Sequence, residues 1–113
     1  MHELSLSQNV IGIIEEQAAL QDFDCVLKVR IEIGALSCVE PEALIFCFEA
    51  VTRGTLAEGA RLEILKVPGQ ALCSDCEAVV PMSRRGEPCP RCDGYRLELR
   101  AGDEIRIKDL EVR

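Results

Sequence analysis

Two pairs of cysteines give this sequence its clearest chemical signal. Each pair follows the pattern C-x2-C, and twelve residues separate the first pair from the second. Two such tight turns can close on one ion, because four thiolates suit the tetrahedral geometry that Zn2+ prefers. The spacing therefore predicts a structural zinc site. Its predicted ligands are Cys73, Cys76, Cys89 and Cys92.

Three other chemistries use the same ligand types. Four thiolates also hold iron in rubredoxin-like sites, and two disulfides would form in an oxidising compartment. Dithiol redox catalysis normally needs only one C-x2-C pair. Structural zinc accounts best for the double pattern, because a closed four-thiolate site supplies folding energy to a segment with few large apolar residues.

The N-terminus carries a second possible metal site. His2 is the only histidine in the chain, and it follows the α-amine of Met1 directly. An amine, a backbone amide and an imidazole form the nitrogen donor set that suits square-planar Ni2+ or Cu2+, with a fourth position for Glu3 or another donor. The alternative is that His2 is a flexible terminal residue and Glu3 an ordinary acidic residue of a first helical turn.

Periodicity predicts the elements that must position these groups. Helical spacing of apolar residues runs from Leu4 to Leu20, and strand alternation from Val26 to Ile33 places Leu27 on the apolar face with Val29. Glu40-Pro41 opens a second helix, because proline suits the first helical position. Further strands are predicted at Arg61–Val67, Arg96–Leu99 and Glu104–Val112.

These elements predict an α+β fold: two helices packed on a small, about three-stranded sheet, with an inserted zinc-ribbon-like four-cysteine module. The expected domains are residues 1–68 plus 101–113 and residues 69–100. Cys25 and Cys47 fit small buried hydrophobic positions, whereas Cys38 lies in a loop and could be partly exposed.

Composition narrows the possible partners and compartment. The 113 residues include 20 acidic and 13 basic side chains, for a formal net charge of −7. This charge disfavours nucleic-acid binding, which requires clustered Lys and Arg. The N-terminus has no signal-peptide pattern and no segment approaches a membrane span, so we expect a cytoplasmic protein without a membrane partner.

Several segments together resemble one family. They are Met1-His2-Glu3-Leu4-Ser5, Ile33-Gly34-Ala35-Leu36-Ser37, the Glu40-Pro41 helix start, Phe48-Glu49 and the two C-x2-C pairs. In order and spacing, over essentially the whole chain, they are similar to the HypA/HybF family of hydrogenase maturation nickel metallochaperones.

The resemblance implies a function and a set of sites. Nickel would be carried as cargo at Met1, His2 and Glu3, and zinc would be bound by the four paired cysteines. It also implies an acidic residue before the second helix that helps the nickel site, a position that Glu40 occupies. For Glu40, hydrogen bonding or helix-start electrostatics is as good an explanation as direct ligation. Residues 1–68 plus 101–113 would then be the nickel-binding domain and residues 69–100 the zinc-binding domain.

The family resemblance also implies partners, namely a nickel-binding maturation GTPase and the large subunit of a hydrogenase. The main alternative is a zinc-ribbon adaptor between proteins, in which His2 has no role. An enzyme is disfavoured, because the sequence shows no nucleophile–base set, no glycine-rich phosphate loop and no zinc site with an open position. Exposed strand edges and spare cysteines are compatible with a monomer or a homodimer.

Overall fold

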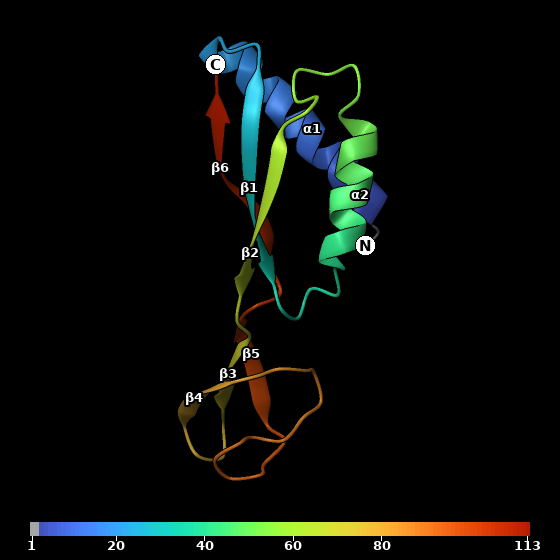
Figure 1. Cartoon of the computed structure of the whole chain (residues 1–113). Helices are drawn as coiled ribbons and strands as arrows, with labels where there is room; N and C mark the ends of the chain where they lie inside the picture. Colours follow the sequence, from blue (N-terminus) through green and yellow to red (C-terminus); the bar gives the residue numbers. More distant parts are fainter. Residues whose placement is uncertain (1–2) are drawn as a thin grey trace. The chain divides into compact units, whose positions relative to one another are not determined.

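The computed structural model describes residues 3–113, and within that range the chain forms two helices and six strands (Figure 1). In chain order they are α1 (Glu3–Gln21), β1 (Val26–Gly34), α2 (Pro41–Val51), β2 (Arg61–Val67), β3 (Gln70–Cys73), β4 (Ala78–Pro81), β5 (Leu97–Ala101) and β6 (Ile105–Val112). The strands form two three-stranded sheets, ordered β2-β1-β6 and β4-β3-β5. The predicted α+β fold with an inserted four-cysteine module is confirmed.

The chain divides into two compact units. Unit 1 combines the chain as far as Ile31 with Val39–Ile64 and Ile107–Arg113, and unit 2 combines Glu32–Cys38 with Leu65–Arg106. The boundary between the units falls within β1, β2 and β6. The chain therefore enters and leaves unit 2 along the three strands of the first sheet, which are far apart in sequence.

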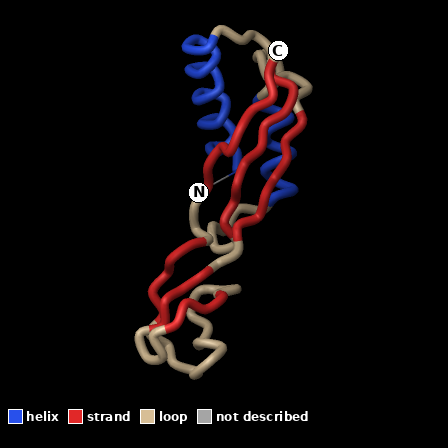
Figure 2. The backbone as a smooth tube through the Cα atoms, turned by 90° about the vertical axis from the view of Figure 1, so that its left-hand side faces the viewer, coloured by secondary structure: helices blue, strands red, loops and turns tan. Residues whose placement is uncertain are grey.

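The two helices of unit 1 lie beside each other on one face of the sheet (Figures 1 and 2). In α1, apolar residues at helical spacing face the core, which gives the helix one buried side. In α2, Leu44 and Phe48 are one helical turn apart, and both are at most 1% exposed. The buried residues of α1 are Leu6, Ser7, Val10, Ile11 and Ile14. No helix among residues 3–113 is long and apolar enough to cross a membrane.

Strand β1 alternates as predicted from Val29 onward but not at its start. Val29, Ile31 and Ile33 are buried, whereas Leu27 is 40% exposed and Val26 is 2% exposed. Strict alternation would have placed Leu27 in the core with Val29. The alternation therefore slips by one residue between Val26 and Val29, and the expected position of Leu27 was wrong.

The other face of this sheet is charged. Arg30 donates from Nε and one Nη atom to the two carboxylate oxygens of Asp109, both at 2.8 Å. This hydrogen bonding lowers the pKa of Asp109 and raises that of Arg30. Lys28 pairs with Glu63 and Glu111 on the same face. One face of the sheet is thus packed under helices and the other is solvated.

Unit 2 contains the second sheet, in which β3 is the central strand. It pairs antiparallel with β4 and with β5, so that Ala71 lies opposite both Val80 and Leu99. Ala71 packs with Leu36 and Met82, and Leu97 and Leu99 cover this small cluster. Strands β3 and β4 were not predicted, because segments of four residues are too short to show periodicity.

Backbones also approach closely in unit 2. A Cβ atom on Gly34 would lie 2.1 Å from the carbonyl oxygen of Gly102, and one on Gly69 would lie 2.2 Å from that of Met82. Gly102 itself has a φ angle of 107°. These contacts explain why positions 34 and 69 are glycine, since any side chain there would displace neighbouring backbone.

Candidate metal centre

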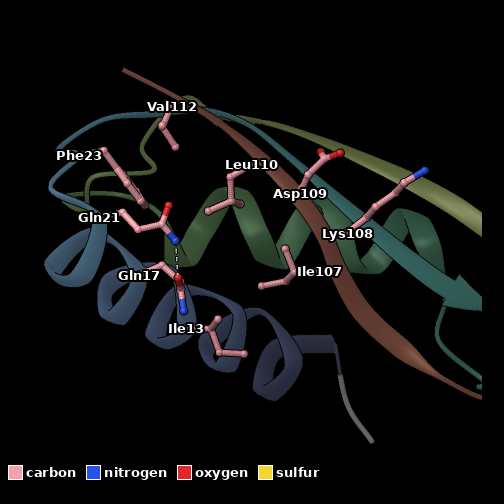
Figure 3. Close-up of a pocket in the computed structure, with 9 residues that line it drawn as sticks. All are labelled: Ile13, Gln17, Gln21, Phe23, Ile107, Lys108, Asp109, Leu110 and Val112. Carbon is pink, nitrogen blue, oxygen red and sulfur yellow. Dashed lines mark hydrogen bonds between the residues drawn. The ribbon is translucent and has the colours of Figure 1, made fainter.

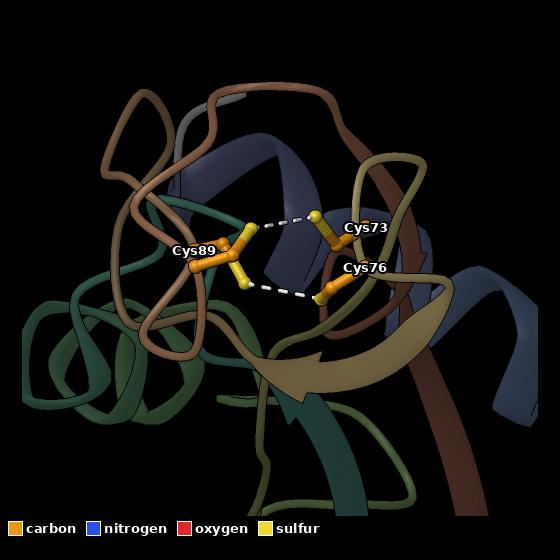
Figure 4. A group of neighbouring side chains, drawn as sticks. Cys73, Cys76 and Cys89 are labelled. Carbon is orange, nitrogen blue, oxygen red and sulfur yellow. Dashed lines mark hydrogen bonds between the residues drawn. The ribbon is translucent and has the colours of Figure 1, made fainter.

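The structure brings all four paired cysteines together within unit 2. Their Sγ atoms all lie within 4.8 Å of one another (Figure 4). Two sulfur–sulfur contacts join one pair to the other: Cys73 to Cys92 at 3.6 Å and Cys76 to Cys89 at 3.8 Å. The labelled side chains in Figure 4 point their sulfur atoms toward a common centre. This is the donor arrangement of a closed tetrahedral site.

Each C-x2-C pair lies in a tight turn that ends in the same way. The residue after the second cysteine has a positive φ angle in both turns, 56° at Glu77 and 61° at Asp93. Backbone hydrogen bonds close the second turn, from Cys89 N to Gly94 O at 2.7 Å and from Asp93 N to Cys89 O at 2.9 Å. The two turns therefore reverse the chain and aim two sulfurs each at the same point.

The protonation of these sulfurs shows why a cation fits between them. Burial raises the pKa of Cys89, but the backbone amides of Arg91 and Cys92 outweigh it and lower the pKa to about 7. The amide of Gly94 lowers the pKa of Cys92, but desolvation and the neighbouring sulfurs raise it to about 12. Desolvation also raises the pKa of Cys76. Without a bound cation, Cys76 and Cys92 would therefore stay protonated at neutral pH.

The sulfurs themselves form part of the core of unit 2. Cys73 and Cys89 are fully buried and pack with Val80, and Leu97 covers the cluster. Few other apolar side chains are present here, so a bound ion would replace a hydrophobic core. The donor set, its geometry and its burial fit a structural Zn2+ ion, which would supply cross-linking and no redox chemistry of its own.

A charged pair lies beside this cluster that the sequence patterns did not reveal. Asp75, inside the first C-x2-C pair, is 3.8 Å from Arg96. A Cβ atom on Gly94 would lie 2.3 Å from Asp75 Oδ2 and 3.3 Å from Cys92 Sγ. The Asp75 carboxylate therefore occupies the space that a side chain on Gly94 would take, beside the Cys92 sulfur. No periodicity in the sequence signals this contact, because it joins two loops.

The N-terminal site falls partly outside the described residues. Met1 and His2 lie outside the range that the structure describes, so its geometry bears on Glu3 and Glu40. Glu3 begins α1, and its Oε2 atom accepts a hydrogen bond from the backbone N–H of Glu40 at 3.1 Å. The two acidic residues that the resemblance assigned to nickel are therefore neighbours, although 37 positions separate them.

Glu40 also has a local structural role. It is the N-cap of α2, its side chain accepts a hydrogen bond from Glu42 N at 3.4 Å, and Pro41 follows at the first helical position. The sequence predicted this helix start from Glu40-Pro41. Helix N-termini attract negative charge, so α1 and α2 each begin with a carboxylate at this place.

The remaining cysteines lie apart from the four-sulfur cluster. Cys25 and Cys47 are partly buried, and Cys38 is exposed with a φ angle of 64°. Arg113 donates to the carbonyl oxygen of Cys25 at 2.8 Å through its backbone amide. None of these three belongs to the group of potential metal ligands found among residues 3–113.

A groove in unit 1 contains none of the predicted ligands. It lies between α1 and β6, has a volume of about 410 Å³, and is partly apolar (Figure 3). Two of its lining residues are bonded to each other, since Gln21 donates to Gln17 one turn earlier in α1 at 2.6 Å. Its lining residues are Ile13, Gln17, Gln21, Phe23, Ile107, Lys108, Asp109, Leu110 and Val112.

Comparison with known proteins identifies the family. Residues 1–112 match the family model described as "Hydrogenase/urease nickel incorporation, metallochaperone, hypA". The chain belongs to the HypA family. Among curated HypA proteins, those named hydrogenase maturation factor HypA from Azotobacter chroococcum mcd 1 and Rhodopseudomonas palustris (strain BisA53) are 54% and 55% identical. Each alignment covers 99% of this chain and 99% of the relative.

Solved HypA structures share the fold. The solution structure of the Ni metallochaperone HypA from Helicobacter pylori matches with a TM-score of 0.72 and 25% identity, over 99% of this chain and 97% of that one. A second solution structure of a HypA protein matches with a TM-score of 0.73 and 26% identity, over 100% and 97%. Family membership makes this chain a metallochaperone of hydrogenase maturation, and the resemblance inferred from the sequence is confirmed.

Proposed function

We propose that this chain binds Ni2+ at its N-terminus and delivers it to the large subunit of a [NiFe]-hydrogenase. The donors would be the α-amine of Met1, the backbone amide and imidazole of His2, and the carboxylate of Glu3, with Glu40 as an accessory group. The observation that supports this most directly is the 3.1 Å hydrogen bond between Glu40 N and Glu3 Oε2. It brings the acidic residue before α2 to the start of α1.

The chemistry of this place suits a cationic cargo. Two helix N-termini are electropositive and would oppose a bare cation by ~0.3 to 1 kcal/mol each. Glu3 and Glu40 supply compensating negative charge, and deprotonation of the His2 amide would supply more. A nitrogen-rich, planar donor set then favours Ni2+ over Zn2+, which prefers a tetrahedral site such as the four cysteines.

The two metals have separate tasks in this proposal. Zinc bound by the four cysteines folds residues 69–100 into a zinc-binding domain, while residues 1–68 plus 101–113 form the nickel-binding domain. The four Sγ atoms within 4.8 Å of one another support the zinc assignment. Zinc stays in place and nickel is passed on.

Delivery requires a site that another protein can enter. Donors at a chain terminus can be displaced one at a time by the ligands of an acceptor, whereas a closed cage would hold the ion. We propose that a nickel-binding maturation GTPase and the hydrogenase large subunit are the partners that exchange nickel with this terminus. The transfer would take place in the cytoplasm, where the zinc thiolates stay reduced.

A nickel titration of the untagged protein beside His2→Ala tests the proposal, with zinc content measured on both. We expect the wild-type protein to bind nickel, the variant to lose that binding, and both to retain about one zinc ion per chain. Retained zinc would show that the variant is folded. Equal nickel uptake by both proteins would remove His2 from the site and favour a zinc-ribbon adaptor.

A further inference from the structure

The four cysteines of the zinc site differ in their exposure to solvent. Cys73 and Cys89 are 0% exposed, Cys76 is half-buried, and Cys92 is exposed. All four nevertheless belong to one cluster, so zinc would be bound by two buried cysteines, one half-buried cysteine and one exposed cysteine. Cys92 is therefore the corner of the site that solvent reaches most readily.

Gly94 and two charged side chains of unit 2 border Cys92. A Cβ atom on Gly94 would lie 3.3 Å from Cys92 Sγ and 2.3 Å from Asp75 Oδ2, so the Asp75 carboxylate takes the space that a side chain on Gly94 would need. Asp75 pairs with Arg96 at 3.8 Å, and the side chains of Asp75 and Arg96 are 41% and 77% exposed. Because both of these side chains are exposed, a small neutral molecule can approach Cys92 without displacing a buried side chain.

We propose that Cys92 is a modification site, at which peroxides and alkylating electrophiles attack the zinc-bound thiolate and release the metal. The proposal rests on the zinc assignment made above. The thiolate, and not the thiol, is the nucleophilic form of cysteine, and zinc keeps all four sulfurs in that form. Exposure then decides which of the four reacts first.

The reaction with hydrogen peroxide balances within the cluster. The Cys92 thiolate attacks one peroxide oxygen, the O–O bond breaks, and a sulfenic acid forms as hydroxide leaves. Cys73, whose Sγ atom lies 3.6 Å away, then attacks the Cys92 sulfur, forms a disulfide and expels a second hydroxide. Two thiolates are oxidised, one peroxide is reduced, and two protons convert the hydroxides to water.

The consequence for the zinc site follows from the loss of two ligands. A disulfide between Cys73 and Cys92 leaves only Cys76 and Cys89 as thiolates, which are 3.8 Å apart and can form a second disulfide with a second peroxide. Zinc bound by two thiolates is held far less tightly than by four. Because Cys73 and Cys89 belong to the core cluster with Val80, oxidation also alters the packing of unit 2.

The test uses the full-length, zinc-loaded protein, whose zinc content is measured first. The protein is treated separately with less than one equivalent of hydrogen peroxide and of N-ethylmaleimide, while a chromogenic chelator records zinc release and peptide mass spectrometry locates the modification. With N-ethylmaleimide, we expect Cys92 to be alkylated before the other three ligands and zinc to be released at the rate of Cys92 alkylation. With peroxide, we expect a Cys73–Cys92 disulfide.

Two variants sharpen this result. Cys38→Ser removes the other exposed thiol and should leave the rate of zinc release unchanged. Cys92→His keeps a zinc ligand but removes the nucleophile, so it should release zinc several-fold more slowly than the wild-type protein. If this variant fails to hold zinc, the order in which the wild-type cysteines are modified still tests the proposal.

Two results would overturn the proposal. They are modification of a buried ligand as early as Cys92, and modification of Cys92 without zinc release. Either of these results leaves the zinc assignment intact. Purified protein that contains no zinc at the outset would instead contradict that assignment.

Discussion

At the scale of single residues, two carboxylates lie where two helices begin. Glu3 Oε2 accepts from Glu40 N, and the Glu40 side chain accepts from Glu42 N in the first turn of α2. The geometry thus gives Glu40 a capping role that does not require metal ligation. Glu3 adjoins the proposed nickel donors directly in sequence, so the two residues should differ in their effect on nickel.

Substitution of each carboxylate tests this difference. We expect Glu40→Gln to lower nickel affinity by a factor of about 2 to 5, the effect of one charge near a helix terminus. Glu3→Gln should lower it further, because it also removes a proposed ligand. Isothermal titration of both variants with native N-termini measures the ratio. Complete loss of binding in Glu40→Gln, with Glu3→Gln nearly normal, would reverse the proposed roles.

The nickel donors should also make binding dependent on pH. An imidazole, an amine and an amide must all be unprotonated to bind, and an ordinary histidine titrates near pH ~6.5. Protons therefore compete with nickel, and affinity should fall as the pH drops from neutral to mildly acid values. Competition with a chromogenic chelator at several pH values measures this. A nickel dissociation constant that is unchanged across that range contradicts the donor set.

At the scale of elements, the glycine contacts of unit 2 fix how closely strands and loops approach. The Cβ atom of Gly34→Ala would lie 2.1 Å from a backbone oxygen of Gly102. Backbone cannot move aside as a flexible side chain can, so we expect this variant to lose about 1 to 3 kcal/mol of unfolding free energy. Urea unfolding of the zinc-loaded protein gives the value.

Gly12→Ala is the matched control. Gly12 lies within α1, and a Cβ atom there would meet no heavy atom within 4 Å. The same substitution should therefore stabilise the protein by about 0.5 to 1 kcal/mol, because alanine favours the helix. A Gly34→Ala protein as stable as Gly12→Ala would show that the strands can shift to accept a methyl group.

The longer elements could be predicted from the sequence because each has its own period or end signal. The start of α2 could be predicted from the proline that follows Glu40. Strand β2 was predicted with the bounds it has, Arg61–Val67. In contrast, β3 and β4 have four residues each, and tertiary pairing defines them. Leu27 was misplaced because alternation cannot reveal a one-residue slip in a strand.

The candidate sites show the same difference between features with a local sequence signal and features defined by tertiary contacts. The four cysteines could be predicted because ligand type and spacing are local properties, and the structure brings all four together. The contact between Glu3 and Glu40 was reached only through family resemblance, since it depends on the packing of two helices. The Asp75–Arg96 pair beside Cys92 joins two loops, and nothing in the pattern of residues signals it.

At the scale of the whole molecule, the chain contains two units with different sources of stability. Unit 1 buries apolar side chains such as Ile14, Leu44 and Phe48, none more than 1% exposed. Unit 2 has small clusters in which cysteine sulfurs are themselves core groups. The first unit should therefore stand without metal, whereas the second should need it.

Zinc removal tests this division. After treatment with a chelator and a reductant, amide hydrogen exchange should accelerate strongly in β3, β4 and β5, while the buried faces of α1 and α2 remain protected. Adding zinc back should restore protection in the same strands. Simultaneous loss of protection in both helices would show that the zinc site supports the entire fold.

The central claim is that nickel binds to the free N-terminus, and one added residue tests it most directly. A glycine placed before Met1 converts its α-amine into an amide but leaves every side chain of the protein unchanged. We predict that the native protein binds nickel at least about tenfold more tightly than the extended one, a difference of ~1.4 kcal/mol, with equal zinc content. Equal nickel affinity of the two proteins would contradict the account.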